Sequence, residues 1–354
     1  MQKKKTKCIG LVFGGVSNEH DVSVNSAKNI YKAFLSFKKD DYVVKAFYLN
    51  RSGNWFDNQI SESILNDVRS GYSKIEENYT PKNNNFLENI NINDIDVWFP
   101  IIHGANGEDG TIQGFLKMTQ KPFIGSGILG SALGMDKIAM KQVLSHLDIP
   151  QVKYLSINLN IDSPEKNLQE FSNQILQNLS FPVFIKPANS GSSLGISKVK
   201  NKHEIYDALL KASKIDTRII AEEGYEVREL ECGVIGKSEL ITSEIGEVRY
   251  ETDWYNYESK YSINNNQIII PAKVDIEIEE KIKNLTIKSC KALNIFGFAR
   301  ADFFFEEKTN KVFLNEINTI PGFTNKSMFP MLWKASGLEI DQLVAKLVDI
   351  AIDS

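Results

Sequence analysis

The sequence has few cysteines, no long apolar run and no excess of positive charge. Its three cysteines, Cys8, Cys232 and Cys290, are far apart and lack metal-ligand spacing, so we expect small core residues in a reducing compartment. No stretch reaches the roughly 18 apolar residues of a membrane span. A formal net charge of -4 argues against a general nucleic-acid binder, which needs clustered Lys and Arg.

The start of the chain is rich in lysine at residues 3–7, but no apolar segment follows before Gly14-Gly15. We therefore expect no signal peptide. These absences predict a cytoplasmic protein that uses neither a membrane nor a nucleic acid. With 354 residues, 42% hydrophobic and 24% charged, the chain is long enough for two or three globular domains.

The strongest chemical signal lies in residues 297–325, where two apolar strands carry Asp302, Glu316 and Asn318. Side chains alternate along a strand, so Glu316 and Asn318 share a face, and Asp302 joins them if a hairpin pairs the strands. Two carboxylates about 4 Å apart repel by roughly 4 kcal/mol at an effective dielectric near 20, and a divalent cation would offset this repulsion. Oxygen donors without His or Cys favour Mg²⁺, which also binds phosphates.

The alternative is a solvated hairpin whose carboxylates simply face water. The surrounding Phe303, Phe304, Phe305, Phe313 and Leu314 argue against it, because they predict a sheet covered on both faces.

The first part of the chain predicts an α/β arrangement. The apolar run 8–13 ends at Gly14-Gly15, and a helical pattern follows, as expected for strand, tight turn and helix. Glu19 in this turn would repel a pyrophosphate and suits a substrate ammonium, although a first-turn acid favoured by the helix dipole is equally consistent. His103 follows the apolar strand 96–102, at the end where open α/β sheets bind ligands; a structural histidine is the alternative.

From residue 151 onward, short strands alternate with helices. Lys186 precedes the Gly/Ser loop 188–195, whose N–H groups and hydroxyls could cradle phosphates, although the loop is not a Walker motif. The strand 218–223 runs into a short connector that could offer backbone groups to adenine, or could be a plain hairpin. The aromatic and polar residues 250–266 predict a lid or binding loop, and the Asn-rich stretch 57–94 predicts surface loop with a short helix at 61–69.

Taken in order, these signals resemble the ATP-grasp fold, and more narrowly the D-alanine–D-alanine ligase family. The resemblance is carried by segments at 14–26, 103–114, 130–141, 185–199, 226–236, 256–261, 298–304 and 315–330. It implies an α/β N-terminal domain followed by α+β ATP-grasp subdomains. We place the N-terminal Rossmann-like domain at 1–120, the central ATP-grasp subdomain at 121–224 and the C-terminal catalytic subdomain at 225–354.

The resemblance implies ATP-driven formation of D-alanyl-D-alanine for peptidoglycan. The first D-alanine carboxylate attacks the γ-phosphate to give an acyl phosphate, and the amine of the second D-alanine displaces phosphate through a tetrahedral intermediate. The implied cofactors are ATP and two Mg²⁺ or Mn²⁺ ions. The family often responds to K⁺, for which no residue here indicates a site, and a homodimer is implied by analogy alone.

The resemblance also assigns roles to individual residues. Those implied for the cation are Asp302, Glu316 and Asn318. Those implied for the nucleotide are Lys137 and Lys186 at the α/β-phosphates, Lys260 at the γ-phosphate, Glu222, Glu223 and Tyr225 at adenine, and Glu229 at the ribose. Those implied for the substrates are Glu19 and His103 at the first D-alanine, Ser327 and Met328 at the carboxylate of the second, and Arg300 with the Gly322 N–H at the oxyanion. Tyr261 and Ser192 would link the lid and the Gly/Ser loop to Glu19.

Two other functions stay open from the sequence. A ligase that takes D-lactate or D-serine as second substrate would have nearly the same residues, although Lys260-Tyr261 resembles the dipeptide-forming type. A catalytically inactive nucleotide-binding module is the second alternative, against which the complete set of charged residues argues.

Overall fold

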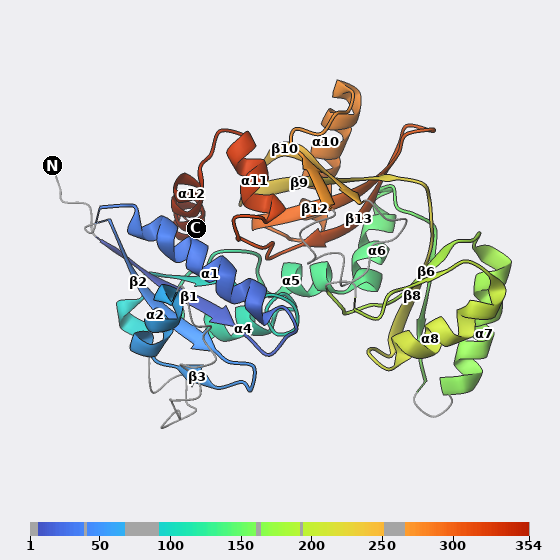
Figure 1. Ribbon diagram of the computed structural model, residues 1–354, viewed down its shortest axis with the longest axis horizontal. Coiled ribbons are helices and arrows are strands. Elements are labelled where there is room, and N and C mark those ends of the chain that lie inside the picture. Colours follow the sequence, from blue (N-terminus) through green and yellow to red (C-terminus); the bar gives the residue numbers. More distant parts are fainter. Residues whose placement is uncertain are drawn as a thin grey trace.

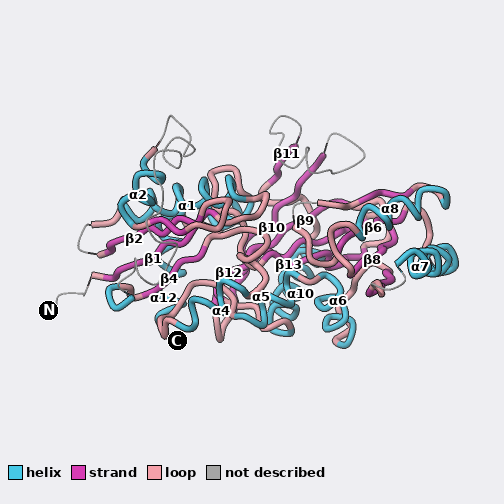
Figure 2. The backbone as a smooth tube through the Cα atoms, turned by 90° about the horizontal axis from the view of Figure 1, so that it is seen from below, coloured by secondary structure: helices cyan, strands magenta, loops and turns pink. Residues whose placement is uncertain are grey.

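The computed structural model describes residues 6–38, 41–67, 92–160, 164–191, 194–250 and 266–353. Three sheets follow one another along the long axis of the molecule (Figures 1 and 2). Within the described ranges, no helix has the length and apolar character needed to cross a membrane.

The N-terminal sheet is an α/β layer. Its strands, in spatial order, are β3 (Trp55–Phe56), β2 (Tyr42–Leu49), β1 (Lys7–Gly14) and β4 (Val97–Pro100). Strands β1, β2 and β4 are parallel, as the buried apolar run at 8–13 predicts. The helices of this part are α1 (His20–Leu35), α2 (Asn58–Asn66) and α4 (Thr111–Met118).

The central sheet is antiparallel. Its strands, in spatial order, are β5 (Tyr154–Asn158), β8 (Arg218–Glu223), β6 (Val183–Pro187) and β7 (Ser197–Val199). Helices α7 (Pro164–Asn178) and α8 (Ile205–Ser213) share one apolar core with it. Residues 188–196, between β6 and β7, contain the Gly/Ser loop.

The C-terminal sheet contains the predicted hairpin. Its strands, in spatial order, are β11 (Asn266–Ile269), β10 (Leu240–Tyr250), β9 (Arg228–Gly236), β12 (Gly297–Glu306) and β13 (Lys311–Asn318). The other helices are α5 (Ile128–Met135), α6 (Lys137–His146), α10 (Ile276–Ala292), α11 (Met328–Ala335) and α12 (Ile340–Ile352). Helix α12 lies against α1, so one apolar core joins both ends of the chain (Figure 1).

The expected covering of the hairpin on both faces is wrong. On β12, Ala301 and Phe303 are buried, whereas Arg300 and Asp302 on the opposite face are only partly buried. The buried face packs in a core with residues of α6 and α10. The other face lines a cavity, and Phe304 stands on that face, so its apolar character is no sign of a second covering layer.

Candidate active site

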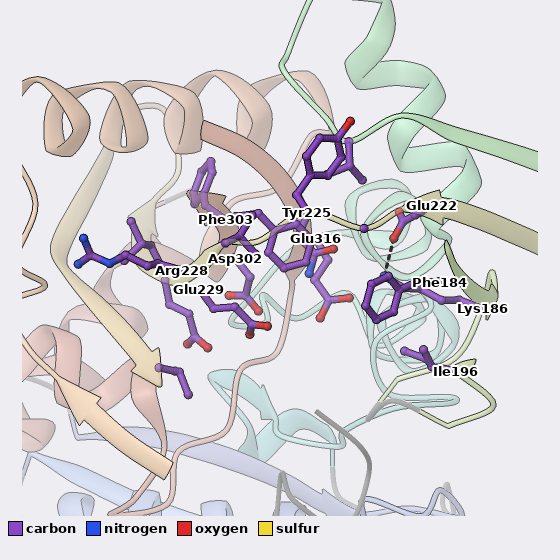
Figure 3. A pocket seen from close by; sticks show the side chains of 18 of the residues that line it. Phe184, Lys186, Ile196, Glu222, Tyr225, Arg228, Glu229, Asp302, Phe303 and Glu316 are labelled. Atoms are coloured by element: carbon purple, nitrogen blue, oxygen red, sulfur yellow. Dashed lines mark hydrogen bonds and ion pairs between the residues drawn. The ribbon is translucent and has the colours of Figure 1, made fainter. Parts of the chain in front are cut away.

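A cavity of about 890 Å³ lies between the central and C-terminal sheets and is lined by residues of both. Its volume is within the range of pockets that bind small ligands and cofactors. In Figure 3, Glu229, Asp302 and Glu316 point toward this space from neighbouring strands, and Phe184 and Lys186 lie on its opposite side.

The acidic side of the cavity depends on the register of the hairpin. Asp302 lies opposite Glu316 and Arg300 lies opposite Asn318, but Phe303 pairs with Leu314, so Asn315 is an extra residue. This bulge changes which side chains of β13 face the cavity. Leu314 is buried in the core, while Glu316 lines the cavity. Bulges of this kind often re-aim side chains beside active sites.

Arg300 is held between two of the acids. Its Nε and Nη2 donate to the two oxygens of Asp302, each at 2.7 Å, and its Nε also lies 2.7 Å from Oε2 of Glu231. Burial alone would lower the pKa of the guanidinium, but Asp302 and Glu231 raise it well above its usual value. Arg300 therefore stays charged.

The donors at the hairpin fit a hard divalent cation. Among the described residues, no cluster of three or more His, Cys, Asp or Glu side chains could hold a metal, and the third predicted donor beside Asp302 and Glu316 is the amide of Asn318, which lies opposite Arg300 in the hairpin. Its Oδ1 accepts a hydrogen bond from the N–H of Ile320 at 3.1 Å, which orients the amide. Carboxylate and amide oxygens suit Mg²⁺ or a similar ion and not zinc.

The basic side of the cavity comes from α6 and β6. Lys137, the first residue of α6, donates to the carbonyl of Ser190 at 2.9 Å and lies 3.4 Å from Glu316 Oε2. It thus connects the Gly/Ser loop with the acidic hairpin. The helix begins there because the side chain of Asp136 accepts from the N–H of Ala139 as its N-cap.

Beneath this side, Glu222 is buried between two lysines. Its oxygens lie 2.9 Å from Nζ of Lys141 and 2.5 Å from Nζ of Lys186. Burial would raise the pKa of Glu222, but the two ammonium groups lower it to about 2. Burial lowers the pKa of Lys141, whereas for Lys186 the carboxylate outweighs burial and raises the pKa.

The connector after β8 is fixed by its own contacts. The N–H groups of Glu223 and Gly224 donate to the carbonyls of Lys153 and Pro182, and the Tyr225 hydroxyl donates to Glu223. Because the carboxylates of Glu222 and Glu223 already have partners in the protein, an adenine contact at this connector would use backbone groups other than these two N–H groups. Glu229 lines the same cavity from β9.

Glu19 lies where the N-terminal sheet meets the Gly/Ser loop. It is the N-cap residue of α1, without a side-chain hydrogen bond to the helix end, so the alternative of an acid favoured by the helix dipole stays open. A Cβ added to Gly104 or Gly191 would lie 2.8 Å or 3.1 Å from its carboxylate. The carboxylate therefore lies beside both glycines, with the side chain of Ser17 next to Gly104.

His103 is buried and joins the N-terminal part to the loop after β13. Its Nδ1 is 2.8 Å from the carbonyl of Ile320, and its Nε2 is 3.2 Å from the Ser26 hydroxyl. That hydroxyl also accepts from the N–H of Phe323. A proton on Nδ1 lets the ring donate to the Ile320 carbonyl, while Nε2 accepts from the Ser26 hydroxyl. These contacts give His103 a structural role, which is the alternative that the sequence leaves open. They do not exclude a role in ligand binding.

Gly322 and Ser327 approach each other in the loop before α11. A Cβ on Gly322 would lie 2.7 Å from Ser327 Oγ, and that hydroxyl also lies 2.7 Å from Thr324 Oγ1. Ser327 is the N-cap of α11, and the side chain of Met328 is buried. The first N–H groups of this helix suit a carboxylate.

Some residues fall outside these groups. Ser192, Lys260 and Tyr261 lie outside the described residues. Sequence reasoning missed Glu231, although it stands two residues from Glu229 on one strand and alternation alone would place both on one face. It also gave no role to Lys141, one helical turn after Lys137.

Comparison with known proteins covers nearly the whole chain. The sequence family described as D-ala D-ala ligase N-terminus matches residues 8–126, and that described as D-ala D-ala ligase C-terminus matches residues 143–349. A protein named D-alanine--D-alanine ligase from Prochlorococcus marinus subsp. pastoris is 60% identical over 100% of both chains. Another of that name, from Prochlorococcus marinus strain MIT 9301, is 60% identical over 99% of both.

Two solved ligase structures also match nearly the whole chain. The VanG D-Ala:D-Ser ligase from Enterococcus faecalis has a TM-score of 0.82 at 32% identity, covering 98% of this chain and 100% of that one. The D-alanine-D-alanine ligase from Coxiella burnetii has a TM-score of 0.81 at 30% identity, covering 99% and 94%.

Proposed function

The chain belongs to the D-alanine–D-alanine ligase family, and we propose that the cavity between the central and C-terminal sheets is its nucleotide site. The protein joins two D-alanines in an ATP-dependent reaction for peptidoglycan synthesis. One observation carries the proposal: lysines of α6 and β6 face carboxylates of β9, β12 and β13 across a cavity of about 890 Å³. This division suits a triphosphate with its cation.

The nucleotide would lie with its phosphates toward Lys137 and Lys186, which are the α/β-phosphate ligands. Lys260 would meet the γ-phosphate. The backbone of the connector 222–225, with Glu222, Glu223 and Tyr225, would contact adenine. Glu229 would accept hydrogen bonds from the ribose hydroxyls, a role that its place on the cavity wall supports.

The family uses ATP with a divalent cation, and we assign Mg²⁺ or Mn²⁺, as two ions, to Asp302, Glu316 and Asn318. When bound, these ions would offset the charge on the β- and γ-phosphates. A response to K⁺ is a further expectation of the family and has no assigned residue.

The two D-alanines would lie between the hairpin and the N-terminal domain. Glu19 would receive the ammonium of the first, and His103 would lie near its carboxylate. Ser327 and the N–H of Met328 would bind the carboxylate of the second. These assignments are supported by the carboxylate of Glu19 beside Gly191 and by the N-cap position of Ser327.

The reaction has two steps. A carboxylate oxygen of the first D-alanine attacks the γ-phosphorus, and the bond to ADP breaks to leave an acyl phosphate. The ammonium of the second D-alanine releases a proton to solvent, the resulting amine attacks the acyl carbon, and phosphate leaves with the second nitrogen proton as the amide forms. Arg300 and the N–H of Gly322 would stabilise the oxyanion between these events, each donor contributing roughly 3–4 kcal/mol. Tyr261 and Ser192 would close the lid and Gly/Ser loop over Glu19 and exclude water, which would hydrolyse the acyl phosphate.

Phosphate release from ATP and product analysis by mass spectrometry test this function. D-alanine should stimulate phosphate release, and D-alanyl-D-alanine should be the main product when D-lactate or D-serine is also present. A depsipeptide or D-alanyl-D-serine as main product would reassign the second substrate. Folded protein that releases no phosphate with D-alanine would point to an inactive nucleotide-binding module.

Three further assignments complete the proposal. We divide the chain into the Rossmann-like domain 1–120, the central subdomain 121–224 and the catalytic subdomain 225–354. We expect a homodimer, by analogy with other ligases of this kind. We place the protein in the cytoplasm, where ATP is available, with no nucleic-acid or membrane partner.

A further inference from the structure

Arg300 shares one side of the cavity with two carboxylates on different strands. Asp302 stands two residues away on β12, and Glu231 lies directly opposite Asp302 on β9. The side chains of Arg300, Glu231 and Asp302 are 12%, 14% and 15% exposed. Because the three lie on one sheet face with little water, the charge of Arg300 depends on these acids for compensation.

The contacts of Arg300 conflict with the cation site. The guanidinium occupies both oxygens of Asp302, at 2.7 Å each, and the same carboxylate is the proposed cation ligand. A guanidinium does not give up its proton, so Arg300 cannot become neutral when a cation binds. It must keep a second negative partner or move away from the place where the oxyanion forms.

Glu231 is placed to be that partner. Its Oε2 lies 2.7 Å from the Nε of Arg300, and its strand is the neighbour of β12 in the centre of the sheet. We propose that Glu231 is a positioning residue, which holds Arg300 in place while Asp302 turns to the divalent cation. This inference rests on the proposed function of Arg300 and Asp302. It names the residue that would hold Arg300 when Asp302 exchanges the guanidinium for the cation.

Without Glu231, Arg300 would have to rely on Asp302. The Arg300–Asp302 pair would then compete with the cation, and cation binding would weaken. Support of this kind around a metal ligand typically changes affinity or activity by about 10- to 100-fold. The effect should reach the cation and kcat, with little change in the KM for ATP once the cation is saturating, because Glu231 is not among the residues assigned to the nucleotide.

Mn²⁺ binding tests this without turnover. Full-length Glu231→Gln would be titrated with Mn²⁺ in the presence of a saturating non-hydrolysable ATP analogue, and bound ion followed by electron paramagnetic resonance. We expect the Kd for Mn²⁺ to rise by about 10-fold or more, kcat to fall to a similar extent, and Glu231→Asp to recover part of both. The charge-matched control is Glu307→Gln, because Glu307 lines the same cavity and pairs with Arg228, not Arg300.

Two results would overturn the inference. The first is that Glu231→Gln binds Mn²⁺ with the Kd of the unsubstituted protein. The second is that Glu307→Gln weakens Mn²⁺ binding equally, which would mean that only the total charge of the cavity matters. Asp302→Asn separates this failure from failure of the proposed function. If Asp302→Asn loses Mn²⁺ and Glu231→Gln does not, only the positioning role fails; if Asp302→Asn binds Mn²⁺ normally, the cation assignment itself fails. Should Glu231→Gln not fold, Glu231→Asp is titrated in the same way. A Kd for Mn²⁺ equal to that of the unsubstituted protein would then overturn the inference.

Discussion

Replacing Glu222 with glutamine removes the carboxylate that lies between Lys141 and Lys186. The side chain of Lys141 is only 1% exposed and lies 2.9 Å from Glu222, so the substitution leaves a buried ammonium without its counter-charge. Breaking a buried ion pair in this way typically costs about 3–5 kcal/mol. Burial already lowers the pKa of Lys141, so the lysine can lose its proton in the variant, and we expect the lower end of that range.

The pH dependence of the unfolding free energy gives a second value for the contribution of Glu222 to stability. The pKa of Glu222 is lowered from 4.5 to about 2, which corresponds to about 3 kcal/mol of stability. Because the folded-state pKa is depressed, this stability is present above the unfolded value and is lost as the pH falls toward the folded value. About 2 kcal/mol of it should disappear between about pH 5 and pH 3. Glu222→Gln has no carboxylate to protonate and lacks this component.

Urea unfolding followed by circular dichroism measures both quantities. The difference in unfolding free energy between the unsubstituted protein and Glu222→Gln should be largest near neutral pH and shrink below about pH 5. Glu223→Gln is the matched control, since its carboxylate contacts Ser180 and Tyr225 and neither lysine. A variant as stable as the unsubstituted protein at pH 7, or a difference constant with pH, would refute the reasoning.

Three other substitutions test the proposed site. Glu316→Gln removes a cation ligand and no core packing, so D-alanine-dependent phosphate release should fall by about 100-fold or more, with an unchanged Tm; an unchanged kcat would contradict the assignment. Ser327→Ala should raise the KM of the second D-alanine by about 10-fold or more and leave the KM of ATP unaltered; equal effects on both would indicate a general defect. His103→Ala removes the contacts with Ile320 and Ser26 and should cost about 1–3 kcal/mol in urea unfolding, together with a higher KM for the first D-alanine; full stability would exclude the bridging role.

Much of the fold follows from local patterns, and one missed helix indicates their limit. Strand β8 has the predicted bounds 218–223, and the apolar run 8–13 lies within β1, because apolar residues and the flanking glycines agree there. Helix α5 was not predicted, since Gly130 and Gly134 lower its helix propensity. The structure gives the reason for these glycines: a Cβ on Gly130 would lie 2.3 Å from the carbonyl oxygen of Asn294, and one on Gly134 would lie 2.7 Å from Thr319. Close packing between distant segments requires them, and local propensity does not include such packing.

The candidate site is predictable in its residue types and less so in its contacts. Alternation places Glu316 and Asn318 on one face, but it would place Leu314 there too, and only the bulge at Asn315 separates them. A bulge depends on how two strands pair, which single-strand periodicity does not describe. The engagement of Glu222 by Lys141 and Lys186 likewise joins three elements through tertiary packing.

The distribution of charge supports the proposal that the cation and the nucleotide bind together in this cavity. The C-terminal sheet brings Glu229, Glu231, Asp302 and Glu316 to one wall, while Lys137 and Lys186 line the other. In the described conformation Lys137 lies 3.4 Å from Glu316 and Arg300 pairs with Asp302, so the walls partly neutralise each other. A triphosphate alone would bring negative charge to the acidic wall, and a cation alone would compete with Arg300 and Lys137. The two together give each wall an oppositely charged partner, so each should strengthen the binding of the other by the same factor.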